Sequence, residues 1–176
     1  GEIEIFGVSH RHHQARSQLA FVPERFTPPY YLTGRDFLQY MLRLRGQTYQ
    51  PATIEAMLQA LDLDLAALTK PVRAYSKGMT QKIGLAAGFL SERALYVLDE
   101  PMSGLDPKAR ALLKRYLQGM KAQGRTLFFS SHALSDVEEI CDRMAILHQG
   151  NLRFIGTPAE CCQHYAASSL EQACMN

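Results

Sequence analysis

The sequence predicts an α/β fold with a mostly parallel sheet, and three observations support this prediction. Two short apolar runs without polar alternation, at residues 95–98 and 126–129, are typical of buried strands in a parallel sheet, and we expect 95–98 to be buried on both faces. Polar residues and then a helical pattern follow each run. Between Ala109 and Met120 the apolar residues recur at the i, i+3, i+4, i+7 spacing of a helix that packs on a sheet.

Length and composition are those of an ordinary globular domain. The 176 residues are enough to bury one core, so a single domain is expected. A formal net charge of +2 implies no strong attraction to nucleic acid or to an anionic membrane. No apolar run is long enough to span a membrane, and the start does not resemble a signal peptide. Four cysteines without Cys-x-x-Cys spacing are expected to be reduced thiols of a cytosolic protein, at Cys141, Cys161, Cys162 and Cys174.

The first elements alternate between short strands and polar loops. Residues 1–7 alternate charged and apolar side chains, and we expect a half-exposed edge strand that ends at a glycine. Three histidines follow between residues 10 and 13, where a metal site is one interpretation and a polar surface loop is the one we favour. A short strand is predicted at 19–22, and Glu24 follows it as an acidic group at a strand end.

A small helical insert is expected next. Thr33 is predicted to cap a helix that ends near Gly46, with Asp36 as its capping-box partner. A second helix is predicted from Pro51 to Leu61. Residues 62–74 show no regular pattern, so we expect an irregular connection there.

The following helix, residues 76–90, is rich in alanine and glycine, which lets a helix lie close to its neighbour. Ser76 is placed as the N-cap, and Lys77 follows it. A helix N-terminus with a serine, a lysine and exposed amides can bind an anion. The alternative is an ordinary capped helix that packs tightly.

The central strand at 95–98 ends in two carboxylates, Asp99 and Glu100, before Pro101 breaks the pattern. In an open α/β sheet, ligands bind at the carboxyl ends of the strands. We predict that Asp99 holds Mg²⁺, directly or through water, because hard cations prefer oxygen ligands. Glu100 is predicted to polarise an attacking water. The alternative for this pair alone is a strand end followed by an acidic turn.

The residues after this strand strengthen the functional interpretation. Asp106 is predicted to cap a helix whose first residue is Pro107 and which is ended by Gly124. A strand, an acidic pair, a tight turn and a capped helix together indicate a nucleotide hydrolase. His132, which follows the strand at 126–129, should face the same crevice as Asp99, although a lone histidine there could also be structural.

The C-terminal part is expected to contain smaller elements. Thr157 and Pro158 are typical of a helix start, and the small polar residues from Ala166 onward predict a loose tail. Before them the pattern predicts a short acidic helix at 134–141, a strand at 144–147, a hairpin turn at 148–151 and a returning strand at 152–155.

Three segments together resemble the ATP-binding subunits of ABC transporters: Tyr-Ser-Lys-Gly-Met-Thr-Gln-Lys at 75–82, Leu-Asp-Glu-Pro-Met-Ser-Gly-Leu-Asp-Pro at 98–107, and Ser-Ser-His at 130–132. Their order and spacing match, and the resemblance covers nearly the whole chain. It implies a P-loop NTPase-like ABC ATPase core as one domain fragment, residues 1–176. A helical subdomain would cover about 30–90, and the core with Walker B, D-loop and H-loop about 91–160.

The resemblance also implies roles for individual residues. Asp99 matches the Walker B aspartate associated with Mg²⁺, and Glu100 matches the catalytic glutamate. His132 matches the switch histidine that senses the γ-phosphate. Asp106 matches the D-loop aspartate, and Glu24 falls on the Q-loop position that contacts Mg²⁺ and the attacking water.

The signature motif of this family falls on Ser76, Lys77, Gly78 and Met79, and it would bind the γ-phosphate of ATP held by the opposite subunit. The usual sequence is Leu-Ser-Gly-Gly-Gln, so Tyr75, Lys77 and Met79 are departures, as is Glu24 in place of the Q-loop glutamine. Ser76 and Gly78 retain the hydroxyl and the bare backbone that a phosphate needs. These departures resemble a subgroup of exporter-type subunits.

The implied cofactors are ATP and Mg²⁺. The implied partners are a second ATP-binding subunit, in a homo- or heterodimer, and a transmembrane permease that docks on the helical subdomain; no nucleic acid partner is expected. The implied location is cytoplasmic, peripheral at the inner face of the plasma membrane.

The 176 residues contain no Gly-Lys dipeptide, whereas ATP binding in this family needs the phosphate loop Gly-x-x-x-x-Gly-Lys-[Ser/Thr]. The chain therefore resembles the family domain truncated at its N-terminal, Walker A portion, and we expect it to be inactive alone. One hypothesis is that an upstream piece completes an ATPase. The other is a non-catalytic remnant or interaction module that presents its signature face to a partner ATPase. A soluble ABC protein of translation or DNA repair is weaker, because only one unit and no long coiled-coil insertion occur.

Overall fold

The computed structural model describes residues 1–175, and its chain divides into two compact units, residues 1–130 and 131–176. The expectation of a single domain with a helical subdomain at about 30–90 stays a prediction.

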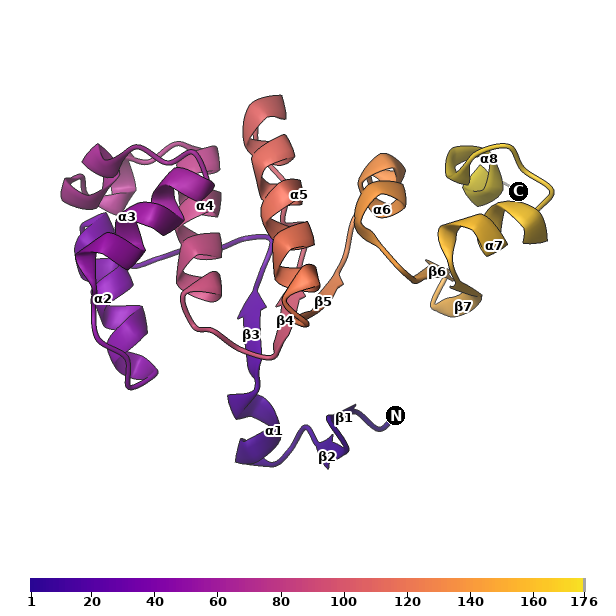
Figure 1. Cartoon of the computed structure of the whole chain (residues 1–176), viewed down its shortest axis with the longest axis horizontal. Coiled ribbons are helices and arrows are strands. Elements are labelled where there is room, and N and C mark those ends of the chain that lie inside the picture. The colour runs from indigo at the N-terminus through magenta and orange to yellow at the C-terminus, as the bar shows by residue number, and fades with distance from the viewer. Residues whose placement is uncertain (176) are drawn as a thin grey trace. The chain divides into compact units, whose positions relative to one another are not determined.

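The first unit is built around a parallel sheet of β3 (Leu19–Val22), β4 (Leu95–Leu98) and β5 (Thr126–Phe129), in the order β3-β4-β5. Figure 1 shows β3 and β4 side by side with the same direction. All three strands were predicted at these residues, and the α/β class with a parallel sheet is confirmed.

The two faces of this sheet differ in burial. Tyr96 and Leu98 of β4 are buried on one face. On the other face Phe21 is 56% exposed and Phe128 is 66% exposed, and both are in register with Val97. The prediction that 95–98 is buried on both faces is therefore wrong, because only one face of these strands is fully covered.

The helical segment of the first unit follows β3 and precedes β4 in the sequence. Its α2 begins with a capping box in which Thr33 and Asp36 bond each other's backbone amides, as predicted. Residues 62–74 are more regular than expected, because they form two short 3₁₀ helices. The bounds are α2 (Gly34–Leu44), α3 (Pro51–Ala60), η1 (Leu65–Thr69), η2 (Val72–Ala74) and α4 (Lys77–Phe89).

Helix α4 packs on the covered face of the sheet, and small residues permit this contact. A Cβ at Gly88 would lie 2.6 Å from Cγ2 of Val22, and one at Gly84 would lie 2.8 Å from Cδ1 of Phe26. Phe89 ends the helix with ring contacts to Tyr96 of β4. The predicted role of the small residues is confirmed.

The start of the chain differs from the prediction. The expected edge strand at 1–7 is shortened to β1 (Glu4–Ile5), which pairs with β2 (Val8–Ser9). The loop expected around the histidines continues into a short helix, α1 (His13–Ser17). The helix after β4 is α5 (Pro107–Ala122), as predicted.

The second unit has its own small core. The predicted helix, hairpin and final helix are α6 (Leu134–Ile140), β6 (Met144–His148), β7 (Asn151–Gly156) and α7 (Pro158–His164). No disulfide joins the cysteines among the described residues.

The expected loose tail is wrong. Residues 170–175 form α8 (Leu170–Met175), and Leu170 is fully buried with Ala173 in a cluster with Val137 and Cys161. The backbone amide of Leu170 also donates to Oε1 of Glu138 at 3.2 Å. The prediction failed because small polar residues dominate this segment. Leu170 and Ala173 lie three positions apart, which is the spacing that a helix brings onto one face.

We predict that Gly88→Ala destabilises the chain by about 1–3 kcal/mol, because its Cβ would overlap Val22 and force the helix away from the sheet. Gly119→Ala on α5 is the matched control, since nothing lies within 4 Å of its added Cβ. It should leave stability unchanged or raise it. Urea unfolding measures both, and equal midpoints for the two variants would contradict the close contact.

The exposed aromatic face predicts self-association, because paired apolar surfaces are removed from water. The double variant Phe21→Thr, Phe128→Thr should reduce the weight-average mass in light scattering. Leu152→Thr, which removes an apolar side chain of similar exposure from the second unit, should not. A wild-type chain that stays monomeric at high concentration would count against this prediction.

Candidate nucleotide-hydrolysis site

The carboxyl ends of the three parallel strands bring the predicted acidic residues to one edge of the sheet. The amide of Asp99 donates to the carbonyl of Val22 at 2.9 Å, and the amide of Ser130 donates to the carbonyl of Leu98 at 3.1 Å. Glu24 lies two residues beyond the end of β3 and is exposed. The edge therefore carries Glu24, Asp99, Glu100 and Ser130 on three neighbouring strand ends.

A serine links the two central carboxylate residues. The Ser130 hydroxyl donates to Oδ1 of Asp99 at 2.6 Å and accepts from the backbone amide of Glu100 at 2.9 Å. Glu100 has φ +45°, a left-handed conformation that costs a non-glycine residue about 1–3 kcal/mol. The hydrogen bond from its amide to Ser130 supports that conformation, so Ser130 orients both neighbours.

Sequence reasoning gave Ser130 no role. It lies in the Ser-Ser-His segment, but one polar residue after a strand is common, and only the pairing of β4 with β5 places it beside Asp99. One indication of such a role was present in the sequence, because Ser130 directly follows a strand that was predicted to be buried.

The signature residues begin α4 as predicted. Ser76 is the N-cap, and its hydroxyl accepts from the amide of Met79 at 3.2 Å. Ser76 and Lys77 are exposed, whereas Gly78 and Met79 are half-buried. An exposed N-terminus of a 13-residue helix offers amide donors and a positive partial charge.

Tyr75, which precedes the cap, ties this N-terminus to the helical segment. Its hydroxyl donates to the carbonyl of Ala67 in η1 at 2.5 Å. Burial raises the pKa of Tyr75 to about 12, so the phenol stays protonated and remains a donor at neutral pH. Gly34 leaves the room for this contact, because a Cβ there would overlap the Tyr75 hydroxyl.

The start of α4 also contacts the loop at residues 101–104 of the same chain. The Lys77 ammonium lies 3.4 Å from Oγ of Ser103, and its stem covers Gly104, where a Cβ would lie 3.0 Å from Cδ and Cε. A Cβ at Gly78 would lie 3.1 Å from the Gly104 carbonyl. One turn further, the buried Gln81 amide donates to the Pro101 carbonyl at 3.2 Å. The sequence did not predict these contacts.

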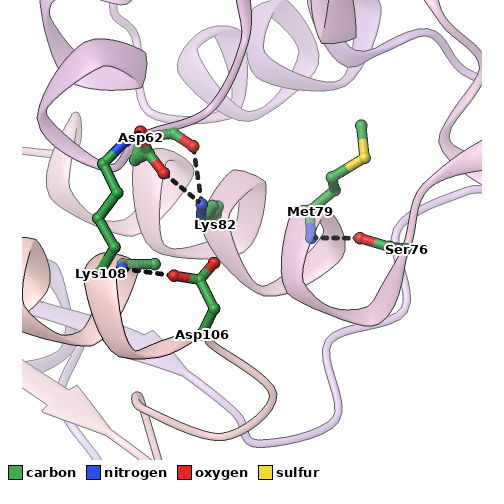
Figure 2. A network of polar contacts seen from close by, with 7 residues as sticks. Asp62, Ser76, Met79, Lys82, Asp106 and Lys108 are labelled. Atoms are coloured by element: carbon green, nitrogen blue, oxygen red, sulfur yellow. Dashed lines mark hydrogen bonds and ion pairs between the residues drawn. The ribbon is translucent and has the colours of Figure 1, made fainter.

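Asp106 caps α5 as predicted, with Oδ1 accepting from the amide of Ala109 at 2.9 Å (Figure 2). This hydrogen bond is the main reason why the pKa of Asp106 is lowered, and the nearby Lys82 ammonium lowers it further. Asp106 is therefore a carboxylate at neutral pH.

His132 belongs to the second unit and is exposed. The Ser131 hydroxyl accepts from the amide of Ala133 at 3.1 Å and so shapes the turn that carries it. The expectation that His132 faces the crevice at Asp99 stays a prediction.

The donor set at the sheet edge fits a hard cation, because it consists of carboxylate and hydroxyl oxygens. Within residues 1–175, no group of three or more His, Cys, Asp and Glu side chains is arranged to hold a metal ion by itself. Mg²⁺ at Asp99 would therefore need further oxygen ligands from phosphate and water.

The chain resembles known proteins in sequence and in fold. A family described as "AAA domain, putative AbiEii toxin, Type IV TA system" matches residues 60–135. The chain is 40% identical over 150 residues to an uncharacterized ABC transporter ATP-binding protein of Synechocystis sp.. The matched region covers 84% of this chain and 42% of that protein. It is 34% identical to the bacitracin transport ATP-binding protein BcrA of Enterococcus faecalis, covering 86% of this chain and 50% of that protein.

A solved structure described as the ATP binding subunit of an ABC transporter superposes with a TM-score of 0.85 and 31% identity. The match covers 99% of this chain and 75% of that one. The chain thus belongs to the ABC transporter ATP-binding proteins, with the P-loop NTPase-like core of that family.

The chain spans about half the length of the curated relatives it matches, or less. None of the helices in residues 1–175 has the length and apolar character needed to cross a membrane.

We predict that Ser130→Ala exposes the Glu100 amide to solvent exchange. Loss of a hydrogen bond worth about 1 kcal/mol should speed exchange of this amide about fivefold. Ser130→Thr keeps the hydroxyl and should restore the slow rate. Ser131→Ala is the control, since its hydroxyl bonds the turn at Ala133 instead. Unchanged exchange at Glu100 in Ser130→Ala would contradict the bridging role.

Proposed function

We propose that this chain is the catalytic part of an ABC transporter ATP-binding subunit, which hydrolyses ATP to power transport across a membrane. The observation that carries the proposal is the Asp99–Ser130–Glu100 cluster at the carboxyl edge of a parallel sheet. Ligands bind at this edge in open α/β folds, and the family membership supports ATP as the ligand.

Each residue of the edge has a distinct role in this proposal. Asp99 holds Mg²⁺, which neutralises charge on the transferred phosphoryl group when bound. The Glu100 carboxylate accepts a hydrogen bond from the attacking water and orients it toward phosphorus. Glu24 contacts the metal or the water. The family resemblance gives His132, which follows the edge in the sequence, the role of sensing the γ-phosphate. The left-handed backbone of Glu100, supported by Ser130, fixes where this side chain leaves the strand.

The signature face acts on a second subunit. The exposed N-terminus of α4, with Ser76, Lys77, Gly78 and Met79, binds the γ-phosphate of ATP held by the opposite subunit of a homo- or heterodimer. Asp106 lies at the start of the neighbouring helix and takes part in the same interface. Lys77 contributes its charge there while its stem packs on Gly104.

The phosphate loop must come from outside these 176 residues, because they contain no Gly-Lys dipeptide. We therefore propose that the chain by itself binds ATP weakly and turns over no ATP. The direction of transport is export, because the variants at Tyr75, Lys77, Met79 and Glu24 resemble an exporter subgroup.

A transmembrane permease is the proposed partner of the helical segment at about 30–90, which places the subunit at the cytoplasmic face of the plasma membrane. Tyr30 and Tyr31 support this docking surface. They are 68% and 70% exposed and contact each other edge to face. Exposed tyrosines are enriched where proteins bind one another.

A second function is an interaction module that does not hydrolyse ATP and presents its signature face to a partner ATPase. The absence of a Gly-Lys dipeptide favours it. The two candidates differ in whether Glu100 is needed for turnover once a phosphate loop is present.

The test is ATP hydrolysis by the chain alone and mixed with a separately expressed N-terminal fragment of a homologous subunit that carries the phosphate loop. We expect activity only in the mixture. Glu100→Gln should lower kcat by at least about a hundredfold and leave ATP binding intact, because it removes the group that orients the water and keeps Asp99. Glu92→Gln, an exposed glutamate before β4, is the control and should retain activity.

Turnover by the Glu100→Gln mixture at the wild-type rate would refute the catalytic role of Glu100. An inactive wild-type mixture that still binds ATP would favour the interaction module. Activity of the chain alone would show that its phosphates bind elsewhere.

A further inference from the structure

Asp62 forms ion pairs with lysines from two helices, α4 and α5. Asp62, between α3 and η1, accepts a 2.6 Å ion-pair hydrogen bond from the Lys108 ammonium at Oδ1. Its backbone carbonyl accepts from the Lys82 ammonium at 2.7 Å, and its Oδ2 lies 3.5 Å from the same nitrogen. Figure 2 shows the three side chains converging from three segments.

The two lysines that contact Asp62 differ in burial, and so they differ in how much they depend on it. Lys82 is 8% exposed, and a buried ammonium is costly unless it is paired and hydrogen-bonded. Asp62 provides both a carbonyl and a carboxylate for it. The Lys108 side chain is 73% exposed, so water can replace its partner more easily. The buried Lys82 of α4 thus needs Asp62 as its partner, whereas the exposed Lys108 of α5 adds a second ion pair.

The backbone at Asp62 is adapted to this arrangement. Its φ of +54° lies in the left-handed region, which aspartate and asparagine tolerate better than other non-glycine residues. The turn directs both the carbonyl and the carboxylate toward lysines. The Lys108 hydrogen bond is the main reason why the pKa of Asp62 is lowered, so the carboxylate stays charged at neutral pH.

The two lysines lie on the helices that begin at the signature and D-loop segments. Lys82 lies six residues after the cap Ser76, and Lys108 lies two residues after the cap Asp106. The amides of Met79 and Ala109 report on these two caps, because each donates to its cap side chain. Asp62 therefore connects the two N-termini through a third segment.

We propose that Asp62 is a positioning residue that holds the N-termini of α4 and α5 in one fixed arrangement, so that the signature amides and Asp106 face the partner's nucleotide together. This role rests on the proposed function, because it concerns the nucleotide interface of that subunit. Asp62 touches neither the nucleotide nor the acidic edge in this assignment, and it acts only through Lys82 and Lys108.

The first test is amide hydrogen exchange in the 176-residue chain, which needs no nucleotide. Asp62→Asn keeps the left-handed backbone and removes the charge. It should speed exchange at both Met79 and Ala109 by about fivefold or more. Lys108→Gln, on the exposed side of the pair, should speed exchange at Ala109 alone. Glu55→Gln removes an exposed carboxylate from α3 and is the matched control, with no change expected.

Urea unfolding separates this role from general stabilisation. If Asp62→Asn leaves both rates within about twofold of wild type, or changes them only by the amount that global unfolding accounts for, the proposal is overturned. Faster exchange at both caps with an unchanged urea midpoint supports it. Because Lys108 is exposed, Lys108→Gln stays folded and tests the α5 contact even where Asp62→Asn unfolds.

The second test uses the ATPase reconstituted with the phosphate-loop fragment. Asp62→Asn should lower kcat about tenfold and change KM for ATP less than about threefold, because the interface is displaced while the nucleotide contacts remain. Unchanged kcat would overturn the positioning role. An inactive wild-type mixture would count against the proposed function instead, and hydrogen exchange would then decide the role of Asp62 by itself.

Discussion

The rest of the site depends on the parallel pairing of β4 between β3 and β5. Parallel strands all end at the same edge of a sheet, so the residues that follow them become neighbours although they are far apart in the sequence. This pairing brings Ser130 to Asp99 and Glu100, and the end of β3, which Glu24 follows, lies at the same edge. Without it, the acidic pair would be an exposed turn.

A second constraint is the close approach of α4 to its neighbours. Gly84 and Gly88 let the helix lie against Phe26 and β3, and Gly78 lets its first turn lie against the Gly104 carbonyl. Gln81 and Lys77 then bond the D-loop segment. Because these contacts use bare backbone and short distances, the start of α4 packs directly on the loop at residues 101–104.

The departures of the signature from the usual family sequence have structural explanations in this chain. Tyr75 replaces an apolar residue and uses its hydroxyl to anchor the helix N-terminus to η1. Lys77 replaces a glycine, and its aliphatic stem fills the space over Gly104. Both side chains make contacts within the chain, whereas in the proposed function Ser76 and Gly78 face the phosphate. This division explains how the motif can vary without losing its core.

The amino-acid sequence by itself determined the three parallel strands, the capped helices at Thr33, Ser76 and Asp106, and the family. These features depend on local patterns: apolar runs, cap residues and motif spacing within a few turns. The tertiary structure decided the rest. The link of Ser130 to the acidic pair, the Asp62 cluster and the packed α8 each join residues distant in sequence or hidden in polar segments. No local pattern encodes such contacts, because burial and strand register arise only when the whole chain is folded.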